Sequence, residues 1–80
     1  KVLISAVRRN TLAGLHGIKP GEKLIAVNGI TPLDLIELSY LTNAETVTLD
    51  IENSSGIVRK VSIEKNLDED LGLEFDTAYA

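Results

Sequence analysis

Residues 17–29 of the chain read GIKPGEKLIAVNG, and this stretch decides the fold. Its Lys-Pro-Gly step predicts a tight turn, because proline fixes one backbone φ and glycine accepts the next. Residues 23–27 follow with the aliphatic composition of a short buried strand. The Asn-Gly pair then predicts a turn that ends this strand. We assign structural roles in this unit to Gly17, Pro20, Gly21, Asn28 and Gly29.

Residues 46–52 alternate apolar and polar side chains, which is the pattern of a half-buried antiparallel strand. The loop Asn-Ser-Ser-Gly at 53–56 then predicts a hairpin that returns along 57–64. Further short strands are expected at 2–7 and 71–75, with a single helical turn at 12–16.

Residues 31–34, Thr-Pro-Leu-Asp, have the form of a helix start, with Thr31 as the N-cap and Pro32 at the first helical position. We therefore predict a helix over residues 32–42. Its apolar side chains are spread too widely around the axis for an ordinary surface helix. One face is expected to pack on the core. The other should meet a second sheet or border a groove that a ligand fills.

These patterns predict one α+β domain over residues 1–80, a small partly open β-barrel or sandwich of four to five strands with one long and one short helix. Apolar residues make up 44% of the chain and charged residues 25%, as in globular proteins. With one Phe and two Tyr, the core must be mainly aliphatic. The sequence contains no Met, from which we expect either a processed chain or, as we favour, a domain cut from a longer protein.

Composition also narrows the functions that the chain can have. It contains no Cys and a single His, which excludes disulfides, iron–sulfur ligation and Cys/His zinc sites within the chain. The net charge of −4 disfavours nucleic acids and anionic membranes as partners. No apolar run approaches the ~20 residues that span a bilayer. We expect a soluble, cytoplasmic domain without a metal or cofactor of its own.

The sequence offers little for catalysis. His16 is expected at the exposed end of the short helical turn, where its ring can reach the last carbonyls. Ser5 and Ser39 carry hydroxyls, but nothing in the sequence brings His16 to either, so no catalytic triad is predicted. We expect that the domain itself is not an enzyme.

The stretch 17–29 resembles the signature of PDZ domains, which have a glycine, an apolar residue, two variable positions, Gly-Asp, an apolar strand and Asn-Gly. Glu22 stands where the family favours Asp. Residues 71–75, Leu-Gly-Leu-Glu-Phe, resemble the carboxylate-binding loop of the family and the strand that follows it. In animal PDZ domains this loop comes early in the chain. The resemblance therefore implies a circularly permuted, bacterial type of PDZ-like domain.

The resemblance also implies a peptide groove between the C-terminal strand and the main helix. The backbone N–H groups of Leu71, Gly72 and Leu73 would converge on the carboxylate of a peptide, and glycine would let the backbone approach it. The peptide would add as a strand along 73–75. On the helix, the alignment places Asp34 where the ligand's third-from-last residue is read. The candidate peptide-binding residues are Leu71, Gly72, Leu73, Glu74, Phe75, Asp34, Leu38 and Leu41.

Other interpretations of these residues remain open. Asp68, Glu69 and Asp70 precede the loop, and three such charges at ~8 Å in water would weaken carboxylate binding about tenfold. Gly72 could mark an ordinary bend before an edge strand. Asp34 could serve only the dipole of its own helix. A segment of the parent protein could fill the groove in cis.

Residues 63–75, IEKNLDEDLGLEF, resemble the segment that closes the N-terminal PDZ-like domain of a bacterial family of radical S-adenosylmethionine iron–sulfur proteins. The resemblance implies a parent protein that binds an iron–sulfur cluster and S-adenosylmethionine, with this chain as a structural or regulatory accessory domain. A further interpretation is the PDZ domain of a bacterial serine protease. In each case the expected partner of this domain is a peptide or protein segment.

Overall fold

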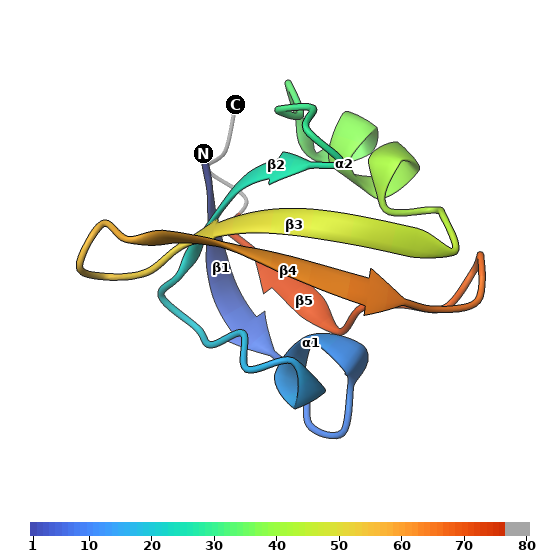
Figure 1. Cartoon of the computed structure of the whole chain (residues 1–80), viewed down its shortest axis with the longest axis horizontal. Helices are drawn as coiled ribbons and strands as arrows, with labels where there is room; N and C mark the ends of the chain where they lie inside the picture. The colour runs from blue at the N-terminus through green and yellow to red at the C-terminus, as the bar shows by residue number, and fades with distance from the viewer. Residues whose placement is uncertain (77–80) are drawn as a thin grey trace.

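The strands of the computed structural model, which describes residues 1–76, form one five-stranded antiparallel sheet in the order β4-β3-β2-β1-β5 (Figure 1). Two short helices complete the fold, and α2 and α1 lie above and below the strands in this view. The elements are β1 (Val2–Val7), α1 (Leu12–Leu15), β2 (Lys23–Val27), α2 (Leu35–Leu41), β3 (Thr46–Glu52), β4 (Val58–Glu64) and β5 (Leu73–Phe75).

The α+β class and the number of strands predicted from the sequence are confirmed. Strands β4 and β5 form the two edges and are not paired with each other, so the sheet is open. The predicted β3–β4 hairpin is present, and in its register Val47 pairs with Ile63 and Leu49 with Val61. The pairing of β1 with β5 brings the two ends of the described chain together.

The prediction of one long helix over residues 32–42 is wrong, because α2 has seven residues and begins at Leu35. Its N-cap is Asp34 rather than Thr31, and the Asp34 carboxylate accepts a hydrogen bond from the backbone N–H of Glu37 at 2.7 Å. The Glu37 carboxylate in turn accepts from the N–H of Leu33 at 2.9 Å. This reciprocal pair satisfies N–H groups on both sides of residue 35 and so fixes the start of the helix there.

The turn residues predicted around β2 lie in turns. Gly17, Gly21, Asn28 and Gly29 all have a positive φ. Asn28 also connects two strands, since its backbone N–H donates to the carbonyl oxygen of Thr48 and its Oδ1 accepts from the N–H of Thr48, both at 2.8 Å. The Asn-Gly turn therefore helps to hold β2 against β3.

A second contact fixes the turn that precedes β2. The guanidinium of Arg59 on β4 donates to both carboxylate oxygens of Glu22, at 2.7 and 2.9 Å, and to the carbonyl oxygen of Gly17 at 3.2 Å. The hydrogen bonds from Arg59 lower the pKa of Glu22, and the Lys19 N–H contributes in the same direction. Glu22 thus ties its turn to β4 by a bidentate, charge-assisted pair.

The core is aliphatic, as the composition predicts. Val47, Leu49 and Ile51 point inward from β3, and the helices contribute Leu38 and Ala13. The buried residues form one continuous cluster that includes Leu71, just before β5. Because both α2 and the segment before β5 pack on this cluster, their positions relative to each other are fixed by the core.

Candidate functional site

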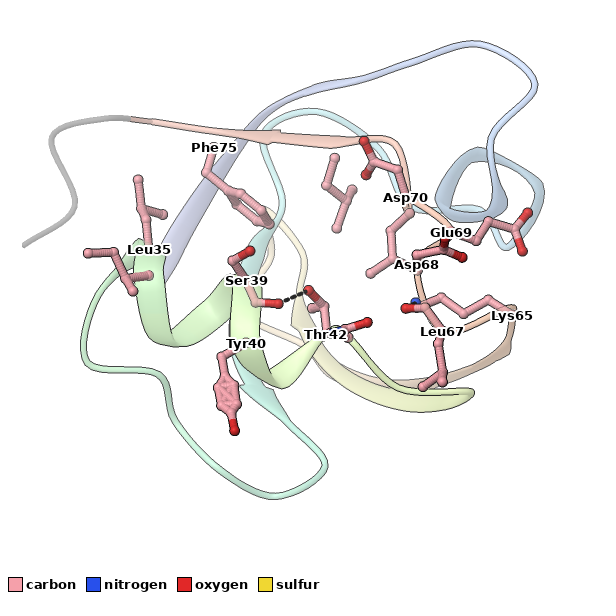
Figure 2. A pocket seen from close by; sticks show the side chains of 14 residues that line it. Leu35, Ser39, Tyr40, Thr42, Lys65, Leu67, Asp68, Glu69, Asp70 and Phe75 are labelled. Atoms are coloured by element: carbon pink, nitrogen blue, oxygen red, sulfur yellow. Dashed lines mark hydrogen bonds between the residues drawn. The ribbon is translucent and has the colours of Figure 1, made fainter.

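A groove with a volume of about 840 Å³ lies between α2 and the C-terminal part of the chain (Figure 2). Helix α2 contributes Leu35, Ile36, Ser39 and Tyr40 to one wall, and β5 contributes Leu73 and Phe75 to the other. Residues 67–71 close one end. The volume is within the ~300–1,000 Å³ typical of ligand sites. The helix and the closing segment therefore lie on either side of one groove.

Strand β5 is an edge strand whose outer side has no neighbouring strand among residues 1–76. On its inner side, the carbonyl oxygen of Gly72 accepts from the N–H of Arg8 at 2.8 Å, and the N–H of Asp76 donates to the carbonyl oxygen of Leu3 at 3.0 Å. Backbone groups of alternate residues in an antiparallel strand point to the same side. The N–H and C=O groups of Leu73 and Phe75 therefore point away from β1, toward the free edge.

The helix wall of the groove exposes apolar side chains. Ile36 is 82% exposed and Tyr40 is 76% exposed, one helical turn apart on α2, and Leu67 is 56% exposed at the groove's end. Phe75 is half-buried, and its ring points from β5 toward the helix (Figure 2). Of the two expectations for the outer face of the helix, the groove is therefore the one that the structure shows. Apolar groups left at the surface in this way are typical of interaction sites.

Gly72 is required for a different reason from the expected approach of a ligand. Its φ is +89°, and a Cβ atom at this position would overlap the side chain of Thr11, the N-cap residue of α1. The glycine is buried, and the space beside its Cα is filled by the protein's own α1 segment. Packing of the loop against α1 therefore requires glycine here, whether or not a ligand approaches.

The backbone N–H of Gly72, for which the resemblance implies contact with a ligand's carboxylate, donates to Oδ1 of Asp70 at 3.0 Å. The other carboxylate oxygen of Asp70 pairs with the guanidinium of Arg8. Arg8 also approaches the carboxylate of Glu74 at 3.5 Å. The Gly72 N–H is thus already hydrogen-bonded to a carboxylate of the chain itself, that of Asp70.

Acidic side chains gather at the end of the groove away from Leu35 (Figure 2). Asp68, Glu69 and Asp70 line this end together with Lys65. The Lys65 ammonium donates to the carbonyl oxygens of residues 66 and 67, both at 3.0 Å, rather than to a carboxylate. Within residues 1–76, the side chain of Asp68 has no hydrogen bond or ion pair. This end of the groove therefore carries a net negative charge.

The remaining candidate residues lie around the groove rather than in its open part. Leu38 is 2% exposed and reaches only the deeper part of the groove from the core. Leu41 is half-buried against the core. The Asp34 carboxylate is used as the N-cap of α2, and Glu74 faces Arg8. Leu71, Leu73 and Phe75 are the candidates that line the open groove.

Most of the helix wall is not predicted from the sequence. The sequence pattern gives Ile36 and Tyr40 only as apolar positions of a widely spread helix, and Leu35 and Leu67 are not among the predicted site residues. The signal is present in the spacing, because residues four apart lie on one helix face. Once Leu38 is placed in the core, Ile36 and Tyr40 fall on the opposite, exposed face of the helix.

Groups suited to catalysis or metal binding are not assembled among the described residues. The Nδ1 atom of His16 lies 2.8 Å from the carbonyl oxygen of Leu12, and the Ser5 hydroxyl donates to the carbonyl of Glu74. No three His, Asp or Glu side chains within residues 1–76 are arranged to hold a metal ion. In the same range, no helix is long and apolar enough to cross a membrane.

Comparison with known sequences adds no relationship. No protein-family model and no curated protein matches the chain. The groove and the free edge of β5 are therefore the observations from which a function can be inferred.

Proposed function

We propose that this chain is a PDZ-like, circularly permuted interaction module that docks an extended peptide or protein segment between β5 and α2, with no reaction of its own. The observation that carries the proposal is the free backbone edge of Leu73 and Phe75 on a strand that lines the groove. A strand edge beside a pocketed, partly apolar surface is the arrangement used in strand addition.

In this mode the bound segment pairs with β5 and becomes the sixth strand of the sheet. Backbone hydrogen bonds to Leu73 and Phe75 supply affinity that depends little on the ligand's sequence. Because each such bond contributes only about 0.5–1.5 kcal/mol net, and β5 has three residues, the complex is expected to be weak and reversible. Apolar ligand side chains that enter between Phe75 and Ile36 supply the rest of the binding affinity.

The opposite edge of the sheet is a poorer candidate for strand addition. Strand β4 carries charged side chains, including Lys60 and Glu64, that are exposed and discourage pairing with another chain. Strand β5 instead alternates Leu73 and Phe75 with a single charged residue, Glu74, whose carboxylate is near Arg8. Strand addition is therefore expected at β5 rather than at β4, and an experiment can tell binding at the two edges apart.

A second candidate function has the same groove filled in cis. In it, the chain is an accessory domain of a radical S-adenosylmethionine iron–sulfur protein, and a segment of that parent lies along β5 and orients a neighbouring domain. What supports this candidate is the bond between Asp70 and the Gly72 N–H, because a segment within a chain has no terminal carboxylate to place there. The proposal of a serine-protease parent gains no such support.

Titration of the ¹⁵N-labelled chain with a pool of extended peptides tests the proposed function. We expect the amide resonances of Leu73, Phe75 and residues 36–40 to shift, while those of β4 do not. Ile36→Ala should weaken the response. Ile57→Ala is the matched control, because Ile57 is 63% exposed and lies in the β3–β4 hairpin loop. Shifts confined to β4, or no shifts in a folded chain, would overturn the proposal.

A further inference from the structure

We infer that the groove selects an internal extended segment that carries a basic side chain, and that it rejects a peptide ending in a free carboxylate at the Gly72 loop. This inference rests on the proposed function and deepens it by naming the chemical class of the bound segment. Its basis is the Asp70 contact with Gly72 and the charge distribution at that end of the groove.

A ligand's carboxylate would have to compete for the backbone N–H of Gly72. A peptide's terminal carboxylate that bound at Gly72 would have to displace the Asp70 carboxylate from the Gly72 N–H. Asp70 is held there a second time by its ion pair with Arg8. It is also intramolecular, so no association entropy opposes its contact, whereas a ligand loses translational and rotational freedom. The Asp70 carboxylate is therefore favoured over a ligand's carboxylate as the acceptor of the Gly72 N–H.

Hydrogen bonds and packing also fix the conformation of the Gly72 loop. The carbonyl of Gly72 accepts from the N–H of Arg8 at 2.8 Å, and the carbonyl of Leu71 accepts from the N–H of Ala13 at 3.0 Å. The Cα of Gly72 packs on Thr11. The loop is thus bonded to β1 on one side and covered by α1 on another. The loop therefore cannot rotate the Gly72 N–H away from Asp70 without losing these contacts.

The charge at this end of the groove favours a basic side chain in the bound segment. Lys65 is the single basic residue among residues 1–76 that lines the groove, against the three acidic residues Asp68, Glu69 and Asp70, and the Lys65 ammonium is engaged with backbone carbonyls. Asp68 is exposed, and within the same range it has no ion pair. A lysine or arginine of the bound segment fits here. An exposed ion pair of this kind is expected to change affinity by about two- to fivefold.

The test uses four versions of one acetylated peptide of alternating Val and Thr, with Lys or Glu at a position near its C-terminus and either a C-terminal amide or a free acid. Dissociation constants come from the amide shifts of Leu73 and Phe75. We expect the Lys amide to bind tightest, with the free acid weaker by about tenfold and the Glu version by about fivefold. Equal or tighter binding of the free acid, or of the Glu version, overturns the inference and leaves the proposed function intact. If no version of the peptide binds, both the inference and the proposed function are contradicted.

Two variants separate the effect of the hydrogen-bonded Gly72 N–H from the effect of the negative charge. Asp70→Ala frees the Gly72 N–H and Arg8 together, and should raise binding of the free-acid peptides relative to the amides by about tenfold. Asp68→Ala is the matched control. It removes the same charge without freeing an amide, so it should reduce the preference for Lys and raise the acid-to-amide ratio by only about twofold, which is the share of one charge in the repulsion. An unchanged ratio in Asp70→Ala contradicts the inference. If Asp70→Ala fails to fold, the four-peptide comparison on the natural chain decides alone.

Discussion

The carboxylate of Asp70 and the backbone N–H of Gly72 are joined by a hydrogen bond of 3.0 Å, in the loop that precedes β5. The neighbouring acids act differently, since Glu69 accepts from the N–H of Asn66 at 3.1 Å and Asp68 is exposed. The three consecutive acidic residues thus differ in role. Asp70 binds the loop amide, Glu69 closes the preceding turn, and Asp68 is exposed.

We expect Gly72→Ala to destabilise the domain by about 2–5 kcal/mol, because an alanine there has an unfavourable positive φ and overlaps Thr11. Gly56→Ala is the matched control. Gly56 has a φ of +80°, but a Cβ added there would meet nothing within 4 Å, so only the cost of the backbone conformation, about 1–2 kcal/mol, applies.

Urea unfolding followed by circular dichroism measures both variants. The double variant Thr11→Gly with Gly72→Ala should recover part of the loss, since it removes the atoms that overlap. Equal destabilisation by the two single alanine variants would mean that α1 does not constrain this loop.

The pair Glu22 and Arg59 predicts a pH dependence of stability. Hydrogen bonds from Arg59 hold the pKa of Glu22 below its ordinary value, so the ionised carboxylate is favoured in the folded state. This stabilisation is fully present above the unfolded pKa and is lost as the pH falls through the lower, folded pKa. Glu22→Gln should cost about 1 kcal/mol near pH 7, and the difference from the natural chain should shrink in acid.

Unfolding free energies at several pH values between about 7 and 2.5 measure this difference. Glu64→Gln serves as the control, because Glu64 is exposed on β4, and it should change stability little at any pH. A Glu22→Gln deficit that stays constant down to the lowest pH would show that the carboxylate's charge contributes nothing.

Local signals in the sequence predict most of the fold. The alternation in β3 and β4 places Val47, Leu49 and Val61 in the core, because a half-buried strand shows its inward face directly as period two. The Asn-Gly turn is equally local. The contact of Asn28 with Thr48 is not predictable in the same way, since the two residues are 20 positions apart.

The candidate site is predictable only in part, for the same reason. Leu73 and Phe75, which line one wall, are among the predicted site residues, whereas the ion pair of Arg8 with Asp70 joins residues 62 positions apart and leaves no local pattern. The bond of Asp70 to Gly72 does have a local signal, because Asp side chains often accept from the N–H two residues on. The start of α2 is misplaced because the Thr-Pro signal competes with Asp34, whose carboxylate makes the observed cap.

The N-cap of α2 gives a prediction that also tests Asp34 as a ligand-reading residue. Asp34→Ala should lower the free energy of unfolding by about 1 kcal/mol, because the N–H of Glu37 loses its acceptor. Asp34→Asn keeps an acceptor and should be close to neutral. Chemical denaturation measures both. If Asp34→Asn leaves stability intact but abolishes the preference for Lys peptides, then Asp34 reads the ligand by its charge in addition to capping.

Neighbouring residues of α2 should separate stability from binding. Leu38 is 2% exposed, so Leu38→Ala leaves a cavity in the core and should cost about 2–5 kcal/mol of stability. Ile36 is 82% exposed, so Ile36→Ala should change stability by less than about 0.5 kcal/mol. Because Ile36 lines the groove, the same variant should weaken peptide binding measured by NMR titration. A stable Ile36→Ala chain that binds the peptide pool as tightly as the natural chain would show that the exposed face of α2 does not contact the bound segment.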